Sequence, residues 1–399
     1  MNNIHAALEI GTSRTVLAIG EAQPGGRLKV SCPAIIPSSG IRKSQILDIN
    51  QATASIRSVL HEAERRLSSQ GDRIEIGNVF LTVSGQHIKA EPVCGSATVA
   101  GDRVTDHEIE EAERSARSRA LPKDRELLDI VDQDYVLDSI GGISSPKGMS
   151  GRVLMLNTLH IHADANRLKD ARAAADQARL EIRDPVFAAT AAAETVLEDH
   201  EKRNGCLVLD LGAGTTGYAA YVDGRLATAG VLGVGGDHVT NDIALAFQTT
   251  QNQAEEIKIA EASATIGDRA DTPRVKLPGD SPLMEARTIS RAALNTVVNA
   301  RMTELCEILS QTLDENGVLH RLHSGVVLTG GGASMRGFPT LLQHCFNLPV
   351  RTGTPIHVDG LSQEPNPERF AAIAGTLLFA HRNYEEKSFL NDILKGFFK

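Results

Sequence analysis

Residues 207–222 read LVLDLGAGTTGYAAYV, and the predicted fold follows from this stretch. A short apolar run ends in Asp210, small residues follow, and an apolar run resumes near Tyr218. The pattern predicts a strand, a glycine turn and a second strand. Glycines let backbone N–H groups approach an anion closely, and successive N–H groups in such a turn form a concavity that favours phosphate. The residues expected to face phosphate are Gly212, Ala213, Gly214, Thr215 and Thr216.

The pattern occurs a second time at residues 6–21, which read AALEIGTSRTVLAIGE. An apolar run again ends in a carboxylate, Glu9, before a glycine and two hydroxyl residues. One such stretch could be an ordinary β-hairpin, but two of them suggest related halves that offer loops to the same phosphates. Glu9 and Asp210 are expected to hold Mg²⁺ through water, because a carboxylate reaches phosphate only through a bridging cation. Neither stretch continues as a P-loop or as a helix-opening GxGxxG.

A third stretch, residues 326–335, reads VVLTGGGASM and predicts a buried strand that runs into three glycines. A backbone without side chains can lie flat against a base and a ribose. The order of two carboxylate-glycine hairpins and a strand with TGGGA resembles the superfold of actin, the heat-shock chaperone ATPases and the sugar kinases. The resemblance implies an α/β, two-lobed, actin-like fold with ATP in the cleft between the lobes.

Composition narrows the class of protein. The 399 residues suffice for more than one domain, and 41% hydrophobic with 23% charged residues is ordinary for a soluble protein. The net charge of −9 argues against nucleic acid as a partner. Five scattered cysteines, none in CxxC, suggest reduced thiols in the cytoplasm. No signal peptide or apolar run of ~20 residues is present, and His160 and His162 are expected to be surface histidines rather than metal ligands.

Periodicity and turn residues divide the chain into elements. Thr105 to Glu108 form a capping box that opens a helix within an inserted α+β module, and Asp237 is expected to cap another helix. Helices are expected at residues 50–67, 109–120, 166–180, 184–197, 254–258, 290–311 and 370–379. The expected divisions are a first lobe at 1–83, 164–203 and 359–381, an insertion at 84–163, a second lobe at 204–236 and 311–358 with an outer part at 237–310, and a tail at 382–399.

Several motifs carry a closer resemblance, to the bacterial cell-division protein family FtsA, over nearly the whole chain. The insertion resembles the FtsA subdomain called 1C, and the glutamate of the first hairpin is typical of this family. The motifs are LEIGT at 8–12, VSGQHI at 83–88, GMSG at 148–151, VGGDHVTNDIALAF at 234–247, EIK at 256–258 and LTGGGA at 328–333.

The resemblance implies a set of residues for ATP and Mg²⁺. One side of the phosphates would face Gly11, Thr12, Ser13 and Arg14, and the adenosine would face Gly330, Gly331, Gly332 and Ala333. Glu255 and Lys258, three residues apart on one helix face, match positions that contact ribose or adenine. In the best alignment Phe187 stands where active relatives carry a residue that orients water, and Asp184-Pro185 is an alternative match, shifted by three. The apolar residue implies slow or absent hydrolysis.

The C-terminal residues 387–399 read KSFLNDILKGFFK. At helical spacing the large apolar residues fall on one side and the lysines on the other, as in helices that lie in an anionic membrane interface. FtsA proteins end in such a membrane-targeting helix. The residues expected to contact lipid are Phe389, Leu390, Ile393, Leu394, Lys395, Phe397, Phe398 and Lys399.

The resemblance implies a protein that polymerises head to tail at the inner membrane face of the division septum. It would tether filaments of the tubulin-like protein FtsZ and recruit later division proteins through the insertion. Two alternatives stay open: a pilus-assembly protein like PilM, and a sugar or acid kinase on the same superfold. A kinase needs a catalytic base in a substrate pocket, and the sequence offers no clear candidate.

Overall fold

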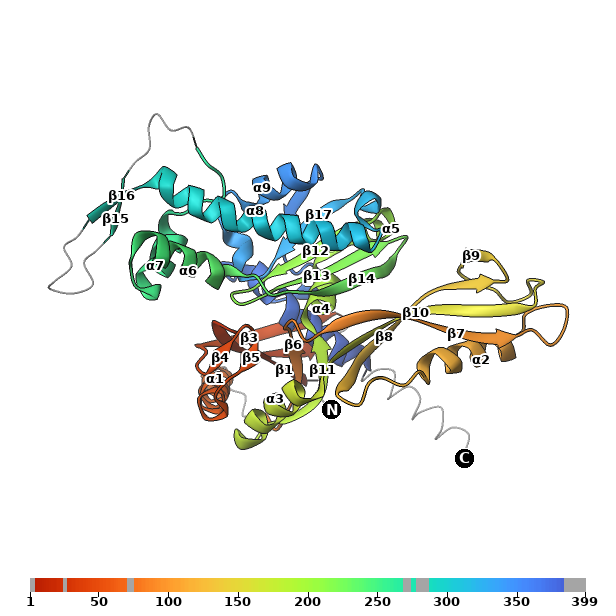
Figure 1. Ribbon diagram of the computed structural model, residues 1–399. Helices are drawn as coiled ribbons and strands as arrows, with labels where there is room; N and C mark the ends of the chain where they lie inside the picture. Colours follow the sequence, from red (N-terminus) through yellow and green to blue (C-terminus); the bar gives the residue numbers. More distant parts are fainter. Residues whose placement is uncertain (1–3, 24–26, 70–74, 268–273, 278–286, 384–399) are drawn as a thin grey trace.

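The computed structural model describes residues 4–23, 27–69, 75–267, 274–277 and 287–383. They form two lobes, one above the other in Figure 1, with an elongated unit that projects from between them. None of the helices among these residues has the length and apolar character needed to span a membrane.

The first lobe is built on a six-stranded sheet in the order β11-β6-β1-β2-β3-β19. The chain forms an antiparallel meander from β1 to β3, and longer connections place β6 parallel to β1 and β11 parallel to β6. The strands are β1 (Ile4–Ile10), β2 (Arg14–Ala22), β3 (Leu28–Pro37), β6 (Asn78–Val83), β11 (Glu181–Phe187) and β19 (Val358–Asp359).

Side chains alternate across this sheet, so each face has its own core. Leu8 and Leu17 face α1 (Ile49–Ser69) and α3 (Ala165–Gln177). Ala7 and Val16 face the opposite way, against a helix over residues 371–383. The expected closing helix of the first lobe therefore covers the second face of its sheet.

The second lobe has the same meander on a nine-stranded sheet, in the order β18-β17-β12-β13-β14-β7-β10-β8-β9. Leu207 and Leu209 point toward α8 (Arg291–Glu315) and α9 (Phe338–Phe346). Val208 points toward α4 (Ala188–Val196), whose alanines fill the space between the two sheets. The strands of the lobe itself are β12 (Cys206–Leu211), β13 (Thr216–Val222), β14 (Arg225–Leu232), β17 (Gly325–Thr329) and β18 (Val350–Thr352).

The projecting unit continues the sheet of the second lobe, because Gly230 on β14 pairs with Lys89 on β7. It has a small core of its own beneath α2 (Asp106–Arg117). The helix starts at the predicted capping box, in which the Thr105 N–H donates to Glu108 Oε2 at 2.8 Å. Its strands are β7 (Lys89–Thr98), β8 (Arg125–Leu137), β9 (Ile140–Ile143) and β10 (Val153–Asp164).

Shorter elements complete the described chain. The outer part of the second lobe carries two helices and a two-stranded ribbon, at the upper left of Figure 1. These elements are α6 (Gly236–Phe247), α7 (Gln251–Glu261), β15 (Arg274–Leu277) and β16 (Arg287–Ser290), and the others are β4 (Ile41–Arg42), β5 (Gln45–Ile46) and α5 (Asp199–Asn204).

Three expectations from the sequence are wrong. The helix predicted at 184–197 begins only at Ala188, because Pro185 disfavours helix in the residue before it and β11 pairs with the parallel strand β6. Helix α6 begins before Asp237, with Gly235 as its N-cap. The expected surface histidines His160 and His162 are 1% and 2% exposed. The predicted membrane helix at 387–399 lies outside the described residues.

Candidate functional site

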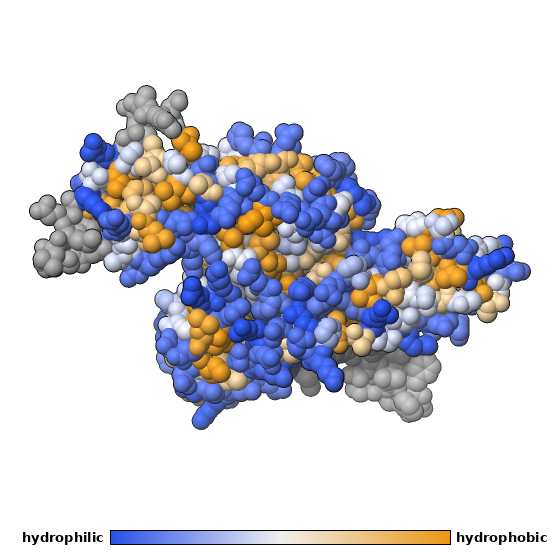
Figure 2. All heavy atoms as spheres, viewed as in Figure 1, coloured by the Kyte–Doolittle hydropathy of each residue, from blue (hydrophilic) through white to orange (hydrophobic). Residues whose placement is uncertain are grey.

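A cavity of about 810 Å³ lies between the lobes, a typical volume for a small-molecule site. Its walls come from both hairpin turns, from the glycines after β17, and from helices α6 and α7. In Figure 2 the notch between those helices and the first lobe lies at the left of the molecule. Three stretches that are far apart in the sequence therefore meet around one space.

The two hairpin turns are closed in the same way. The Gly11 N–H donates to the Arg14 carbonyl and the Gly212 N–H donates to the Thr215 carbonyl, both at 3.0 Å. The turns also touch each other across the lobes, since a Cβ on Gly214 would lie 2.5 Å from Thr12 Oγ1. Glycine at this position is thus required by the close approach of the first lobe.

The carboxylates of Glu9 and Asp210 face the same cavity. Burial, and after it the charge of the nearby Glu9 carboxylate, raise the pKa of Asp210 to about 7 against the opposing effect of Arg14. Burial also raises the pKa of Glu9, although Arg14 and Arg369 oppose the shift. Two neighbouring carboxylates whose charged forms are disfavoured by burial suit a divalent cation.

This donor set fits Mg²⁺ better than a cation that needs many protein ligands. The described residues contain no cluster of three or more His, Cys, Asp or Glu side chains placed to hold a metal ion. Mg²⁺ usually keeps several waters and binds through one or two carboxylates together with phosphate oxygens. Glu9 and Asp210 supply such a pair.

The third stretch reaches the cavity at the end of β17. Gly330 has φ 83°, and a Cβ there would lie 2.3 Å from Asp210 Oδ1, so the backbone packs directly against that carboxylate. The following 3₁₀ turn, η3 (Gly331–Ser334), is held by another, η4 (Pro367–Phe370). The Thr329 hydroxyl and the Gly330 N–H both donate to the Glu368 carbonyl, at 2.8 and 3.1 Å.

Glu255 and Lys258 lie on α7 and line the cavity. Lys258 Nζ donates to Glu255 Oε2 at 2.6 Å, to Thr240 Oγ1 at 2.9 Å and to the Gly236 carbonyl at 3.2 Å. The lysine side chain is 11% exposed, so this pair is a fixed part of the wall rather than a loose surface salt bridge.

Two of the sequence-predicted residues do not line the cavity. Thr216 lies in β13, where its hydroxyl donates to the Val234 carbonyl at 2.7 Å. Ala333 packs into the core of the second lobe. The other predicted residues on the two hairpins, on α7 and on the glycine stretch all border the cavity: Glu9, Gly11, Thr12, Ser13, Arg14, Asp210, Gly212, Ala213, Gly214, Thr215, Glu255, Lys258, Gly330, Gly331 and Gly332.

The sequence interpretation missed several further residues of the wall. Ser84 follows β6, which runs parallel to β1, so its place at the same sheet edge as Glu9 could have been inferred. Arg369 gave no such signal, because it reaches the cavity only through the packing of η4 on η3. The missed residues are Ile10, Ser44, Thr82, Ser84, Ala188, Gly236, Asp237, Thr240, Gln251, Asn252, Ile259, Ala262, Ser334, Met335, Arg336, Asn366, Arg369 and Ala372.

Arg14 and Arg369 place positive charge beside the two carboxylates. Arg14 Nη2 donates to the Arg369 carbonyl at 2.5 Å, while Arg14 Nη1 is buried and has no hydrogen-bond partner among the described residues. Burial and the charge of Arg14 lower the pKa of Arg369. Desolvated guanidinium groups are stabilised by an anion, and the N–H donors of a guanidinium group suit the oxygens of a phosphate group.

The chain is similar to known proteins along its length. The sequence model of the family described as "Cell division protein FtsA" matches residues 207–375, and the one described as "SHS2 domain inserted in FTSA" matches residues 85–162. The cell division protein FtsA of Pseudomonas aeruginosa is 32% identical over 374 residues, which are 93% of this chain and 88% of that protein.

Solved structures show the same architecture. The PilM-PilN type IV pilus biogenesis complex aligns with a TM-score of 0.67 at 19% identity, over 94% of this chain and 98% of the other. MreB5 of Spiroplasma citri, bound to ADP, aligns with a TM-score of 0.57 at 15% identity, over 96% and 98% of the two chains. These likenesses concern the fold alone, and they confirm that it is actin-like.

Proposed function

The chain belongs to the FtsA family of cell-division proteins, and on that premise we propose that it binds ATP with Mg²⁺ between its two lobes. The observation that supports this most is the convergence of both hairpin turns and the glycine stretch on one cavity of about 810 Å³. The hairpins would cradle the phosphates, and the stretch at Gly330–Gly332 with α7 would hold the nucleoside.

The roles of the charged residues follow from the geometry of the wall. Arg14 and Arg369 would neutralise phosphate oxygens, and Lys258 would present a fixed cation beside the ribose. Glu9 and Asp210 would hold Mg²⁺, which when bound supplies a positive charge shared between carboxylates and phosphates. MreB5 with bound ADP is an example of a nucleotide in the same fold.

Nucleotide would serve mainly as a structural ligand, with slow or absent hydrolysis. Phe187 immediately precedes α4, is 2% exposed and packs into the core rather than into the cavity wall. An apolar side chain there cannot orient an attacking water. A steady-state rate like that of an efficient kinase, about 1–100 per second, would contradict this view.

The test is equilibrium binding of ATP to the full chain, with and without Mg²⁺. Asp210→Asn should weaken Mg²⁺-dependent binding at least tenfold. The matched control is Asp223→Asn, which removes an exposed carboxylate on the β13–β14 turn, where it pairs with Arg321 at 2.6 Å. Equal binding by both variants would reject the cavity as the site, and turnover that depends on an added sugar or acid would favour the kinase alternative.

The cellular role proposed for the chain is that of other FtsA proteins: a head-to-tail polymer that ties FtsZ filaments to the inner membrane face at the septum. The apolar face of residues 387–399 would bind lipid, and the inserted unit would recruit later division proteins. Deleting residues 388–399 should abolish co-sedimentation with anionic liposomes while leaving co-sedimentation with FtsZ intact. Unchanged lipid binding would reject the tail as the anchor, and absence of FtsZ binding by the full chain would favour a PilM-like role.

A further inference from the structure

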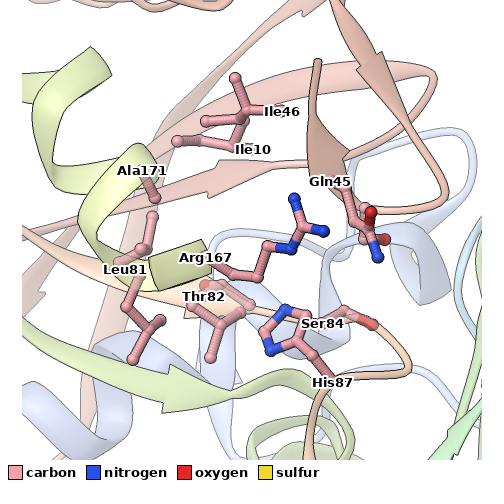
Figure 3. Close-up of a pocket in the computed structure, with 12 residues that line it drawn as sticks. Ile10, Gln45, Ile46, Leu81, Thr82, Ser84, His87, Arg167 and Ala171 are labelled. Carbon is pink, nitrogen blue, oxygen red and sulfur yellow. The ribbon is translucent and has the colours of Figure 1, made fainter. Parts of the chain in front are cut away.

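A second, much smaller cavity adjoins the first one inside the first lobe (Figure 3). It shares Ile10, Ser44, Thr82 and Ser84 with the wall of the interlobe cavity, so the two spaces are neighbours. Its volume of about 40 Å³ suffices for a few water molecules, each of which needs roughly 10–15 Å³, or for one small oxyanion. It is too small for a nucleoside. We call it the side pocket.

The side pocket has a polar side and an apolar side. Figure 3 shows Arg167, Gln45, Ser84 and His87 gathered at one side. Ile10, Ile46, Leu81 and Ala171 lie across from them. Apolar walls lower the local dielectric constant, and this strengthens any interaction between the guanidinium and an anion.

Arg167 has a free guanidinium in this pocket. Its backbone N–H donates to the N-capping carboxylate of Asp164 at 3.2 Å, but the guanidinium donates no hydrogen bond to any other residue that the structure describes. Asp164 accepts a further hydrogen bond from the Asn166 N–H at 2.8 Å, and the charge of Arg167 adds to these backbone donors in lowering the pKa of the Asp164 carboxyl. The N–H groups of the Arg167 guanidinium can therefore donate hydrogen bonds to an oxyanion.

His87 contributes an acceptor. Its Nδ1 atom is buried and has no hydrogen-bond partner among the described residues. Burial is the main cause that lowers the pKa of His87 to about 4, so the ring is neutral near pH 7. A hydrogen bond to the Ser84 backbone raises that pKa, which identifies the ring as the donor in it. Because a neutral imidazole donates from one nitrogen only, Nδ1 is left with a lone pair that can accept a proton.

We propose that the side pocket binds inorganic phosphate in its protonated forms. The phosphate oxygens accept hydrogen bonds from Arg167, and the P–OH group donates to His87 Nδ1. Phosphate could enter from solution or from a nucleotide in the interlobe cavity, and this second source rests on the proposed function. The arrangement selects phosphate over sulfate, because sulfate has the same shape but carries no proton to donate at neutral pH.

The test measures phosphate binding to the nucleotide-free full chain by calorimetry or by ³¹P NMR. Binding should be saturable, and sulfate should bind at least tenfold more weakly. Arg167→Gln should weaken phosphate binding at least tenfold and Arg167→Lys by less, since lysine keeps the charge without the fork. Lys169→Gln, an equal charge change at an exposed position of the same helix, should have no effect. Thermal unfolding of each variant checks that it is folded.

A measurement with saturating ADP distinguishes phosphate in the side pocket from phosphate in the interlobe cavity. It also tests the phosphate proposal separately from the proposed function. Phosphate in the side pocket should bind equally well with ADP present, so displacement by ADP would place the phosphate in the interlobe cavity and overturn the proposal. Equal affinity for sulfate, or equal phosphate affinity of the Arg167→Gln and Lys169→Gln variants, would overturn it as well. Failure of ADP itself to bind would count against the proposed function only, because the phosphate measurement does not depend on it.

Discussion

The two hairpins that meet at the cavity differ in what they present to it. Both turns close with the same 3.0 Å hydrogen bond, and in both preceding strands the residue before the last is a carboxylate. The β1–β2 turn carries the side chains of Thr12 and Ser13, whereas the β12–β13 turn has two glycines and an alanine before its one hydroxyl residue, Thr215. The reason is steric, because Gly214 lies against Thr12 and Lys43 and leaves no room for a side chain.

The carboxylates of the two hairpins differ as well. Arg14 and Arg369 offset the burial of Glu9, whereas Asp210 has Arg14 alone to oppose burial and the charge of Glu9. The negative charge of Asp210 is therefore less compensated than that of Glu9, and a bound cation would stabilise Asp210 more. The two turns are thus related in sequence but differ in what they present. The β1–β2 turn presents side chains to the cavity, and the β12–β13 turn depends on close packing of its backbone.

The largest expected effect comes from giving the second turn a side chain. In Gly214→Val the new Cβ would lie 2.5 Å from Thr12 Oγ1 and 2.8 Å from Lys43 Cα. We expect a loss of about 1–3 kcal/mol in the free energy of unfolding, together with a loss of nucleotide binding. The control is Ser13→Val at the matching, exposed position of the first turn, where the loss should stay within about 0.5 kcal/mol. Urea unfolding measures the free energy of unfolding of both variants. Equal losses would show that the two turns tolerate a side chain equally well.

The pattern of residues predicted both turns but not the contact between them. A carboxylate, a glycine and two hydrogen-bonded strands are local features, whereas the approach of Lys43 to Gly214 depends on how the lobes pack. The same limit explains the error at β11. Val186 and Phe187 continue an apolar stretch that fits a helix, and only β6, about 100 residues earlier in the chain, makes them a strand.

The buried histidines of the projecting unit show a further limit of prediction from the sequence. His160 and His162 lie two residues apart in β10 and therefore on one face of the strand. Their burial depends on partners from other strands: Arg125 at the start of β8 donates to His162 Nδ1 at 2.7 Å. Arg369 was missed in the cavity wall for the same reason, since it reaches the wall only through the packing of η4 on η3.

The next effect concerns the asymmetry of the carboxylates. A carboxyl whose folded pKa is raised holds its proton more tightly in the folded state, so it favours folding at low pH and loses this effect as pH rises. For Asp210 the window runs from 3.8 to about 7. Without Mg²⁺, Asp210→Asn should match the wild type below pH 3.8. Above pH 7 it should exceed the wild type's free energy of unfolding by roughly 4 kcal/mol, because each pKa unit between 3.8 and about 7 contributes about 1.4 kcal/mol.

Glu9→Gln is the companion variant. Its gain in the free energy of unfolding above pH 7 should be smaller, because Arg14 and Arg369 already compensate the charge of Glu9. Chemical unfolding at a series of pH values, in the presence of a chelator, gives the comparison. A larger gain for Glu9→Gln than for Asp210→Asn would reverse the proposed asymmetry. Added Mg²⁺ should reduce the gain of both variants, since the cation relieves the repulsion in the wild type.

The smallest effect concerns the polar contact between the lobes. Thr215 Oγ1 lies 3.2 Å from Ser44 Oγ and 3.3 Å from Ser84 Oγ, so one hydroxyl of the second turn meets two hydroxyls of the first lobe. A double-mutant cycle of Thr215→Val with Ser44→Ala should give a coupling energy of about 0.5 kcal/mol, because Ser84 can replace the lost partner. Adding Ser84→Ala to the background should raise that coupling toward about 1 kcal/mol, since Ser44 is then the sole remaining hydroxyl partner of Thr215 in this cluster. If the coupling is zero in both backgrounds, the hydroxyls do not join the lobes, and the close packing of Gly214 against the first lobe accounts for the contact alone.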